Sequence, residues 1–297
     1  MWVGVHEPTS AELKAIGFSF QLNAAAVEEA LDDGLRPKVE QYDGTTLIVL
    51  RPVRYVEPAD ATRDGEVETA AIVIFCGVHF LITVRYGEAA ALRQVRRDLE
   101  SHPELLRQGA WSVVCGIAER VVDEYLSVAH EVECDLDELE ARVLEMDSRQ
   151  AIARLRQFKR GIVDFKRAVL PLQRPLGALV AGHPVIIPAG LAPFLRGASD
   201  RLGLAAEQVR SFDDLLNYLM TSHLATIDVE QNRDMRKIAA WASVAALWGI
   251  VAGIYEMTQD FTSLHRDHNG LMFGGTVAAT AITSILLYLR FRRAGWL

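Results

Sequence analysis

The chain has 297 residues and a formal net charge of −8, with 31 basic and 39 acidic side chains. This acidic balance argues against a nucleic-acid-binding protein, because such proteins gather positive charge against the phosphates. The three cysteines form no CxxC motif, which indicates reduced thiols rather than a disulfide framework; they are Cys76, Cys115 and Cys134.

Residues 1–102 predict an α/β domain. A short strand at 2–5 precedes a helix capped by Thr9 or Ser10, and Asn23 can cap a second helix at 24–34. Strands are expected at 37–42, 45–56, 67–77 and 79–87, with the hairpin signal Asp43-Gly44 between the first two, and a helix at 88–101.

The same region carries no recognisable catalytic set. No Gly-rich phosphate loop follows a strand, and no Ser/His/Asp or Cys/His arrangement is visible. The histidines His6, His79 and His102 are isolated in the sequence. Such histidines are more often packed or surface residues than metal ligands or catalytic bases. We therefore expect no enzyme activity and assign no catalytic residue. The first 13 residues also lack a signal-peptide pattern.

Residues 103–204 predict a helical hairpin followed by a connector. Asp147 or Ser148 can cap the second arm just after the turn. Both arms carry apolar residues at heptad spacing. These are Tyr125, Ala129, Val132, Leu136, Leu139 and Val143 in the first arm, and Leu155, Phe158, Ile162, Phe165, Val169 and Leu172 in the second.

The two arms carry opposite charge. Residues 123–147 contain ten acids and one base, whereas 149–174 contain eight bases and one acid. One interpretation is a solvated hairpin whose arms attract and neutralise each other. The other is that the acidic arm concentrates cations near a pore mouth through its long-range field.

The end of the chain predicts a membrane hairpin. A helix at 205–237 continues without a break into an apolar stretch at 238–257, which has the length of a membrane span, and a second stretch follows at 271–289. Basic residues precede the first span and follow the second, in the tail 290–297. The positive-inside rule therefore places both termini in the cytoplasm and the loop 258–270 outside. A buried soluble hairpin is the alternative.

The first span has a small face and a large face. Trp241, Val244, Trp248, Val251 and Tyr255 form the large one. Small residues allow helices to approach closely, and they can equally line an axial path between symmetry-related copies. The small face recurs at steps of three and four and reads Asn232, Met235, Ala239, Ala242, Ala246, Gly249 and Gly253, ending at Glu256.

The chain resembles the CorA family of divalent-cation transporters over essentially its full length. The matching pieces, specific through their order, are WVGVHEPT (2–9), RPKVEQYD (36–43), LRPVRY (50–55), FLITVR (80–85), RAVLPL (167–172), NRDMRK (232–237), AGIYEM (252–257) and YLRFRRAGWL (288–297).

The resemblance implies an α+β membrane protein that forms a funnel-shaped homopentamer. An α/β cytoplasmic domain, a long helical hairpin and a stalk helix would precede a pore-lining first span in the plasma or inner membrane. It implies passive entry of Mg²⁺, with Co²⁺, Ni²⁺ and Zn²⁺ as further candidates, and no covalent cofactor. The same cation bound between protomers would regulate the pore. The expected partners are further copies, lipid and divalent cations, with no nucleic acid.

The resemblance also assigns site residues. Asn232 aligns with an inner polar ring, while Met235 and Ile238 align with an apolar gate. The family signature Tyr-Gly-Met-Asn becomes Tyr255, Glu256, Met257 and Thr258 at the outer mouth, so an acidic ring replaces a glycine and a hydroxyl replaces an amide. The external loop would attract cations with Asp260, His265, Asp267 and His268, and the regulatory candidates are Asp98, Asp200, Asp213 and Asp214.

Two functions follow from this departure. One is a conducting divalent-cation transporter, and the other is a non-conducting scaffold or cation sensor that has lost permeation. The altered signature and the alanine-lined stripe are the reasons to consider the non-conducting scaffold or sensor. Imidazoles suit Zn²⁺, Co²⁺ or Ni²⁺ better than Mg²⁺, so the two loop histidines leave a transition-metal cargo open.

Overall fold

The computed structural model describes residues 1–32, 34–57, 65–88, 91–143, 145–261 and 269–294. The chain divides into two units, Met1–Thr221 and Ser222–Leu297, which are described separately.

A five-stranded sheet lies at the start of the first unit, in the order β1-β7-β6-β3-β2. Its strands are β1 (Trp2–His6), β2 (Lys38–Tyr42), β3 (Thr45–Leu50), β6 (Ala71–Cys76) and β7 (Leu81–Tyr86), and only the β1–β7 pair is parallel. The hairpin between β2 and β3 is confirmed. Asp43 and Gly44 have φ values of 42° and 85°, as a two-residue turn with positive φ requires.

Two predicted strands are each broken into two elements. The run at 45–56 becomes β3 and β4 (Val53–Val56), and the run at 67–77 becomes β5 (Glu66–Thr69) and β6; β4 and β5 pair as a separate two-stranded ribbon. Pro52 explains the first break, because it has no N–H to donate to a sheet. The Ala70 N–H donates to the Pro52 carbonyl at 3.0 Å. The break between β3 and β4 therefore lies beside the break between β5 and β6.

Both predicted helix caps near the N-terminus are confirmed. Thr9 caps α1 (Ser10–Ser19) through a capping box with Glu12, and the Asn23 side chain accepts from the Ala25 N–H at 2.9 Å at the start of α2 (Ala24–Glu29). The predicted end of the second helix at residue 34 is wrong. Turns closed by bonds three residues apart replace the helix after Glu29.

The remaining elements of the first unit are mainly helical. They are α3 (Ala91–Ser101), α4 (Pro103–Leu106), α5 (Ala110–Val143), α6 (Ser148–Val169), η1 (Leu170–Leu172), α7 (Gln173–Val180), η2 (Ala189–Leu191) and the start of α8 (Ala192–Phe261). Asp147 caps α6 by accepting from the Arg149 N–H at 3.2 Å, as predicted. All twelve residues of the two predicted heptad seams are buried in one hydrophobic core.

The helix α8 starts earlier than predicted. It begins at Ala192 rather than at 205, and it ends at Phe261 rather than at 257. Pro193 does not prevent this start, because a proline in the first turn of a helix removes an N–H that has no intrahelical partner anyway. The stretch predicted as the second span lies in α9 (Asn269–Arg293).

The three thiols differ sharply in exposure. Cys76 and Cys115 are buried, and burial raises the pKa of both thiols to about 12, whereas Cys134 is exposed on α5. Because the thiolate is the nucleophile, iodoacetamide at pH 8 is expected to modify Cys134 alone in the folded protein. Intact mass spectrometry should record one adduct, rising to three after denaturation. Rapid modification of Cys115 in the folded chain would contradict this core.

Candidate pore-lining face

Within the second unit, α8 and α9 meet along one stripe of each helix. On α8, Ala240 is buried and Val244, Leu247 and Val251 are half-buried. On α9, Thr280 is buried, and the half-buried residues are Ala281, Ser284, Leu287 and Phe291. The steps of three and four along each stripe are those of two helices packed side by side.

The residues predicted to line a pore lie on another face of α8. Asn232, Met235, Ala239, Ala242, Ala246, Gly249 and Gly253 are all exposed within this one chain. At 3.6 residues per turn, the stripe from Ala239 to Gly253 lies about 150° around the helix from the stripe that meets α9. The small residues therefore do not serve packing within the hairpin.

The chemistry of this face changes along the helix. Asn232 offers an amide at one end, and Met235 and Ile238, which are 65 % and 63 % exposed, supply flexible and branched apolar side chains. Beyond them only methyl groups and bare glycine backbone project from the stripe. Such a face can border a wide path that offers no charged or strongly binding group to an ion.

The outer-mouth residues are only partly described. The helix continues through Glu256, whose side chain is exposed, to Phe261. The side chains of Tyr255, Met257, Thr258 and Asp260 lie outside the described set, and so do residues His265, Asp267 and His268 in full. Their assignment to the mouth and external loop stays a prediction.

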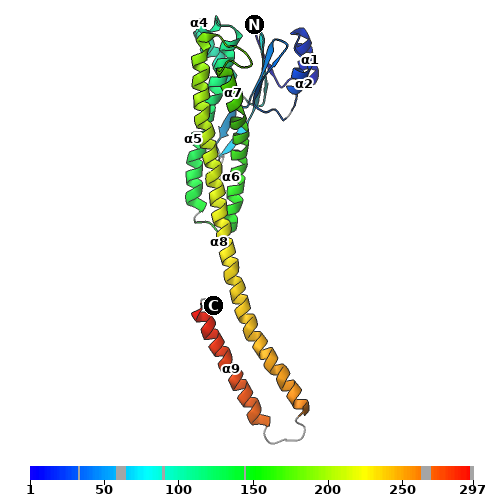
Figure 1. Cartoon of the computed structure of the whole chain (residues 1–297), viewed down its shortest axis with the longest axis vertical. Helices are drawn as coiled ribbons and strands as arrows, with labels where there is room; N and C mark the ends of the chain where they lie inside the picture. The colour runs from blue at the N-terminus through cyan, green and yellow to red at the C-terminus, as the bar shows by residue number, and fades with distance from the viewer. Residues whose placement is uncertain (33, 58–64, 89–90, 144, 262–268, 295–297) are drawn as a thin grey trace. The chain divides into compact units, whose positions relative to one another are not determined.

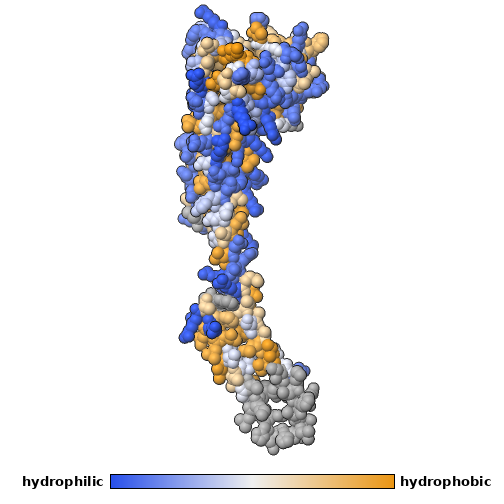
Figure 2. Space-filling model, viewed as in Figure 1, coloured by the Kyte–Doolittle hydropathy of each residue, from blue (hydrophilic) through white to orange (hydrophobic). Residues whose placement is uncertain are grey.

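The first apolar stretch has the character of a membrane span. Among the described residues, one helix, within Ala189–Gly253, is long and apolar enough to cross a membrane, and only 6 % of its most apolar window is buried. Figure 2 shows apolar surface over this part of α8 and over α9. So exposed a surface argues against a buried soluble hairpin. Several side chains of 271–289 are outside the described set, so the second span stays a prediction.

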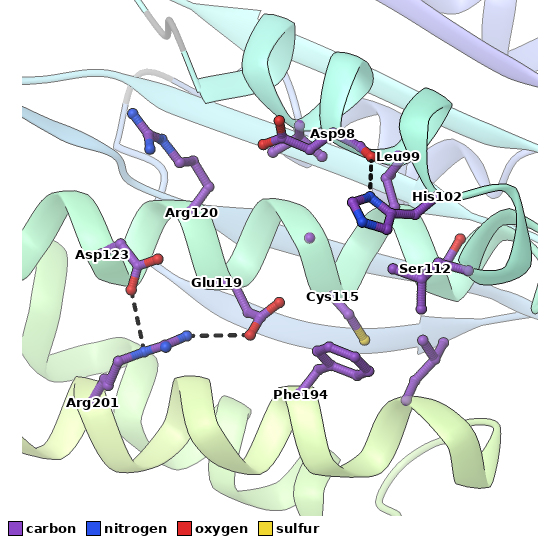
Figure 3. A pocket seen from close by; sticks show the side chains of 14 residues that line it. Asp98, Leu99, His102, Ser112, Cys115, Glu119, Arg120, Asp123, Phe194 and Arg201 are labelled. Atoms are coloured by element: carbon purple, nitrogen blue, oxygen red, sulfur yellow. Dashed lines mark hydrogen bonds and ion pairs between the residues drawn. The ribbon is translucent and has the colours of Figure 1, made fainter.

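A charged pocket in the first unit was missed by sequence reasoning. It has a volume of about 260 Å³ and lies between α3, α5 and the start of α8 (Figure 3). Arg201 donates to Glu119 at 3.3 Å, and its Nε lies 3.2 Å from Asp123 without the alignment of a hydrogen bond. The interacting residues are about 80 positions apart in the chain, so no local spacing reveals the pair.

The pocket makes the stability of the protein depend on pH. Burial raises the pKa of the Glu119 carboxyl above its usual value of 4.5, and the nearby Arg201 guanidinium opposes part of that shift. The folded state therefore holds this proton more tightly than the unfolded chain does. This contribution to stability is lost as the pH rises from 4.5 through the folded pKa.

Glu119→Gln, which cannot ionise, is expected to raise the Tm at pH 7 by a few degrees and to leave it nearly unchanged at pH 4. Thermal unfolding of the detergent-solubilised protein measures this shift. Asp123→Asn is the matched control, because Asp123 is about half exposed and its charge costs little to hold. A lower Tm for Glu119→Gln at pH 7 would mean that the ion pair with Arg201 outweighs the burial cost.

The four regulatory candidates are not brought together. Asp98, Asp200 and Asp214 are exposed, and Asp98 lines the charged pocket. Asp213 is held by Lys166 at 2.7 Å and faces Lys159 at 4.0 Å, so its charge is already balanced within the chain. Across the described part of the chain, no group of three or more His, Cys, Asp or Glu residues is arranged to hold a metal ion.

These features define a class: a membrane protein with an α/β unit, whose long helix turns an uncharged, small-residue face away from its hairpin partner. The family model described as CorA-like Mg²⁺ transporter protein matches residues 1–293, so the chain belongs to that family.

Two curated relatives match nearly the whole chain. The cobalt/magnesium transport protein CorA of Thermotoga maritima is 22 % identical over 295 residues, 99 % of this chain and 82 % of that protein. The magnesium transport protein CorA of Haemophilus influenzae is 25 % identical over 312 residues, 100 % of this chain and 92 % of that protein.

Two solved structures share the fold. The complete CorA magnesium transporter from Methanocaldococcus jannaschii has a TM-score of 0.72 at 17 % identity, covering 100 % of this chain and 91 % of that one. The full-length CmaX protein has a TM-score of 0.64 at 18 % identity, covering 97 % and 88 %.

Proposed function

We propose that this protein transports divalent metal cations across the membrane, with Mg²⁺ as the principal cargo. One observation carries the proposal: the small, uncharged face of α8 points away from α9 and is exposed in the single chain. A face of this kind needs a partner, and further copies of α8 around an axis would convert it into the lining of a path. The relatives named as magnesium and cobalt transport proteins support the same cargo class.

The pore requires an oligomer, because two helices cannot enclose a path. We propose a homopentamer in the plasma or inner membrane, with both termini in the cytoplasm. The α/β domain and the helical hairpin would hang from α8 as the walls of a funnel. A cytoplasmic divalent cation bound between protomers would hold the pore shut, using exposed carboxylates such as Asp98, Asp200 and Asp214 from neighbouring chains.

The outer mouth would select cations by charge. Glu256 would place one carboxylate per copy around the axis, next to the Thr258 hydroxyl. Mg²⁺ sheds its water reluctantly, so a carboxylate ring holding a hydrated ion through its water shell suits it. An ion can leave a pore only if its binding sites are weak or multiple. The uncharged stripe that follows Glu256 along the path offers no strong ligand that would trap the ion.

The second candidate is a non-conducting scaffold or cation sensor. The replacement of Gly by Glu256 and of Asn by Thr258 at the family signature favours it. A carboxylate ring that coordinates a divalent ion directly would bind it tightly and block the path. Such a protein would keep the fold and the assembly and lose permeation.

Mg²⁺ influx into proteoliposomes that contain the purified full-length protein separates the two candidates. Glu256→Gly/Thr258→Asn is measured alongside the unaltered protein, with protein-free liposomes as the control. Influx by the unaltered protein supports transport through a different filter. Influx only after the signature is restored supports the scaffold, and silence from both removes transport.

The loop histidines give a separate prediction about cargo. If His265 and His268 bind a transition metal, His265→Ala/His268→Ala should lower the affinity for Zn²⁺ by about tenfold or more, because imidazole is a preferred zinc ligand. Mg²⁺ influx should stay unchanged. Isothermal titration with ZnCl₂ measures the affinity. Equal Zn²⁺ binding by both proteins would remove the histidines from any cargo role.

A further inference from the structure

A row of arginines follows the exposed side of α6. Arg149, Arg156, Arg160 and Arg167, the arginine row, are all exposed. Their spacing of seven, four and seven places them within about 40° of one another around the helix at 3.6 residues per turn. The row is therefore a single straight line of positive charge, opposite the buried seam of the same helix.

The arginine row is unlike the other bases of α6. Lys159 and Lys166 both face Asp213 of α8, so they share one carboxylate within the chain. Arg167 lies 3.2 Å from Asp164. Among the described residues, the other three members of the row form no ion pair, so their charge is available to a partner outside the chain.

The exposed side of α5 carries the opposite sign. Glu131, Asp137 and Glu138, the acidic row, are exposed, and Cys134 lies among them. Glu138 is 3.5 Å from Arg142, yet its side chain is still 73 % exposed. In Figure 1, the end of α5 and the start of α6 lie on either side of α8. The acidic and arginine rows thus belong to different sides of the first unit.

The two rows also match in height along the hairpin. α5 ends at Val143 and α6 begins at Ser148. Because the turn between them is short, we take the two helix ends as lying at about the same level. Glu131 and Arg160 are each twelve residues from these ends, about 18 Å along each helix. Rotation about an axis parallel to the helices keeps every residue at its height. In a ring of copies, Glu131 of one chain therefore comes level with Arg160 of the next.

We propose that the acidic row on α5 of one copy docks against the arginine row on α6 of the next copy around the ring. Such a contact is heterologous, head to tail, which is the kind of interface that closes a ring. Complementary charge fixes which side meets which and the vertical register. The inference rests on the proposed function for the existence of a ring, and it assigns the surfaces that join neighbours.

Charge reversal tests the pairing. Arg156→Glu/Arg160→Glu is expected to lower the ring fraction of the full-length protein in detergent about tenfold, measured by native mass spectrometry, with a smaller loss at higher salt, because salt screens the new repulsion between like charges. Adding Glu131→Arg/Glu138→Arg in the same chain should restore the ring. Lys14→Glu/Arg97→Glu makes the same charge change on exposed residues of α1 and α3 and should leave the ring intact.

Cross-linking tests the register without disturbing the acidic row. Cys134 is nine residues from Val143, and Arg156 is eight from Ser148, so the two lie within about 1.5 Å in height. Arg156→Cys with the natural Cys134 should give a ladder of linked chains with a short bis-maleimide, whereas the unaltered protein and Lys14→Cys should stay single chains. A cross-link between two cysteines of the same chain leaves the mass of a single chain, so it cannot be mistaken for a link between neighbours.

The outcomes separate this inference from the proposed function. An intact ring without linked chains, or a ring unaffected by Arg156→Glu/Arg160→Glu, overturns the docking and leaves transport standing. A single-chain protein under all conditions overturns the ring itself, and with it the proposed pore. Loss of the ring that the reciprocal substitutions on α5 do not restore also overturns the pairing.

Discussion

Substituting phenylalanine for Ala246 is expected to abolish Mg²⁺ influx. Ala246 is exposed on the small face of α8, on the side away from α9. One aromatic ring per copy would meet around the axis at the same height. Apolar constrictions of this kind close channels by expelling water. The expected loss of influx in proteoliposomes is at least about tenfold, with the assembly intact.

Ala252→Phe is the matched control for this substitution. It makes the same chemical change on the same exposed helix, but Ala252 lies about 90° from the centre of the small face. Its ring would project toward lipid, so influx should stay within about twofold of the unaltered protein. Equal influx by Ala246→Phe and the unaltered protein would place the cation path elsewhere.

Tyr125→Ala is expected to have the largest effect on stability. The Tyr125 side chain is fully buried, its ring centroid lies 6.2 Å from that of Phe165, and its hydroxyl donates to the Arg51 carbonyl at 2.8 Å. It therefore joins α5 to α6 and to the end of β3. Removing a buried aromatic ring costs about 3–5 kcal/mol through lost contacts and the cavity left behind.

The buried thiol of Cys115 reports this loss within the first unit. Its modification by a maleimide requires opening of the core, so the modification rate measures the free energy of opening. Tyr125→Phe keeps the ring and removes the hydroxyl, and it should cost only about 1 kcal/mol. If Cys115 is modified equally slowly in Tyr125→Ala and in Tyr125→Phe, other residues hold α5 and α6 together.

Heptad spacing and cap chemistry were enough to predict most of the helical part of the fold. The seams around Tyr125 and Phe165 are buried, and Thr9, Asn23 and Asp147 cap the helices that they precede. Strand boundaries were harder, because a β-branched run shows no sign of where the chain leaves one sheet for another. The break at Pro52 depends on pairing with Ala70, which only the tertiary structure reveals.

Part of the candidate site could be proposed from the sequence because its residues repeat along one helix. The stripe from Asn232 to Gly253 follows from steps of three and four, and the structure places these residues on an exposed face of α8; that they line a pore stays a prediction. The Glu119–Arg201 pair was not predictable, because it joins α5 to α8 across about 80 positions. For α5 and α6, the sequence showed only that the two helices carry opposite net charge. The structure was needed to distinguish the bases that face Asp213 from the arginines that are exposed.

The most direct test of the central claim is the structure of the full-length assembly in lipid nanodiscs, determined by electron cryo-microscopy with Mg²⁺ removed. The claim predicts several copies around one axis, with Ala239, Ala246 and Gly249 of every copy facing a continuous path. If those residues instead face lipid or pack against α9, with no path along the axis, α8 does not line a pore and the transport proposal fails.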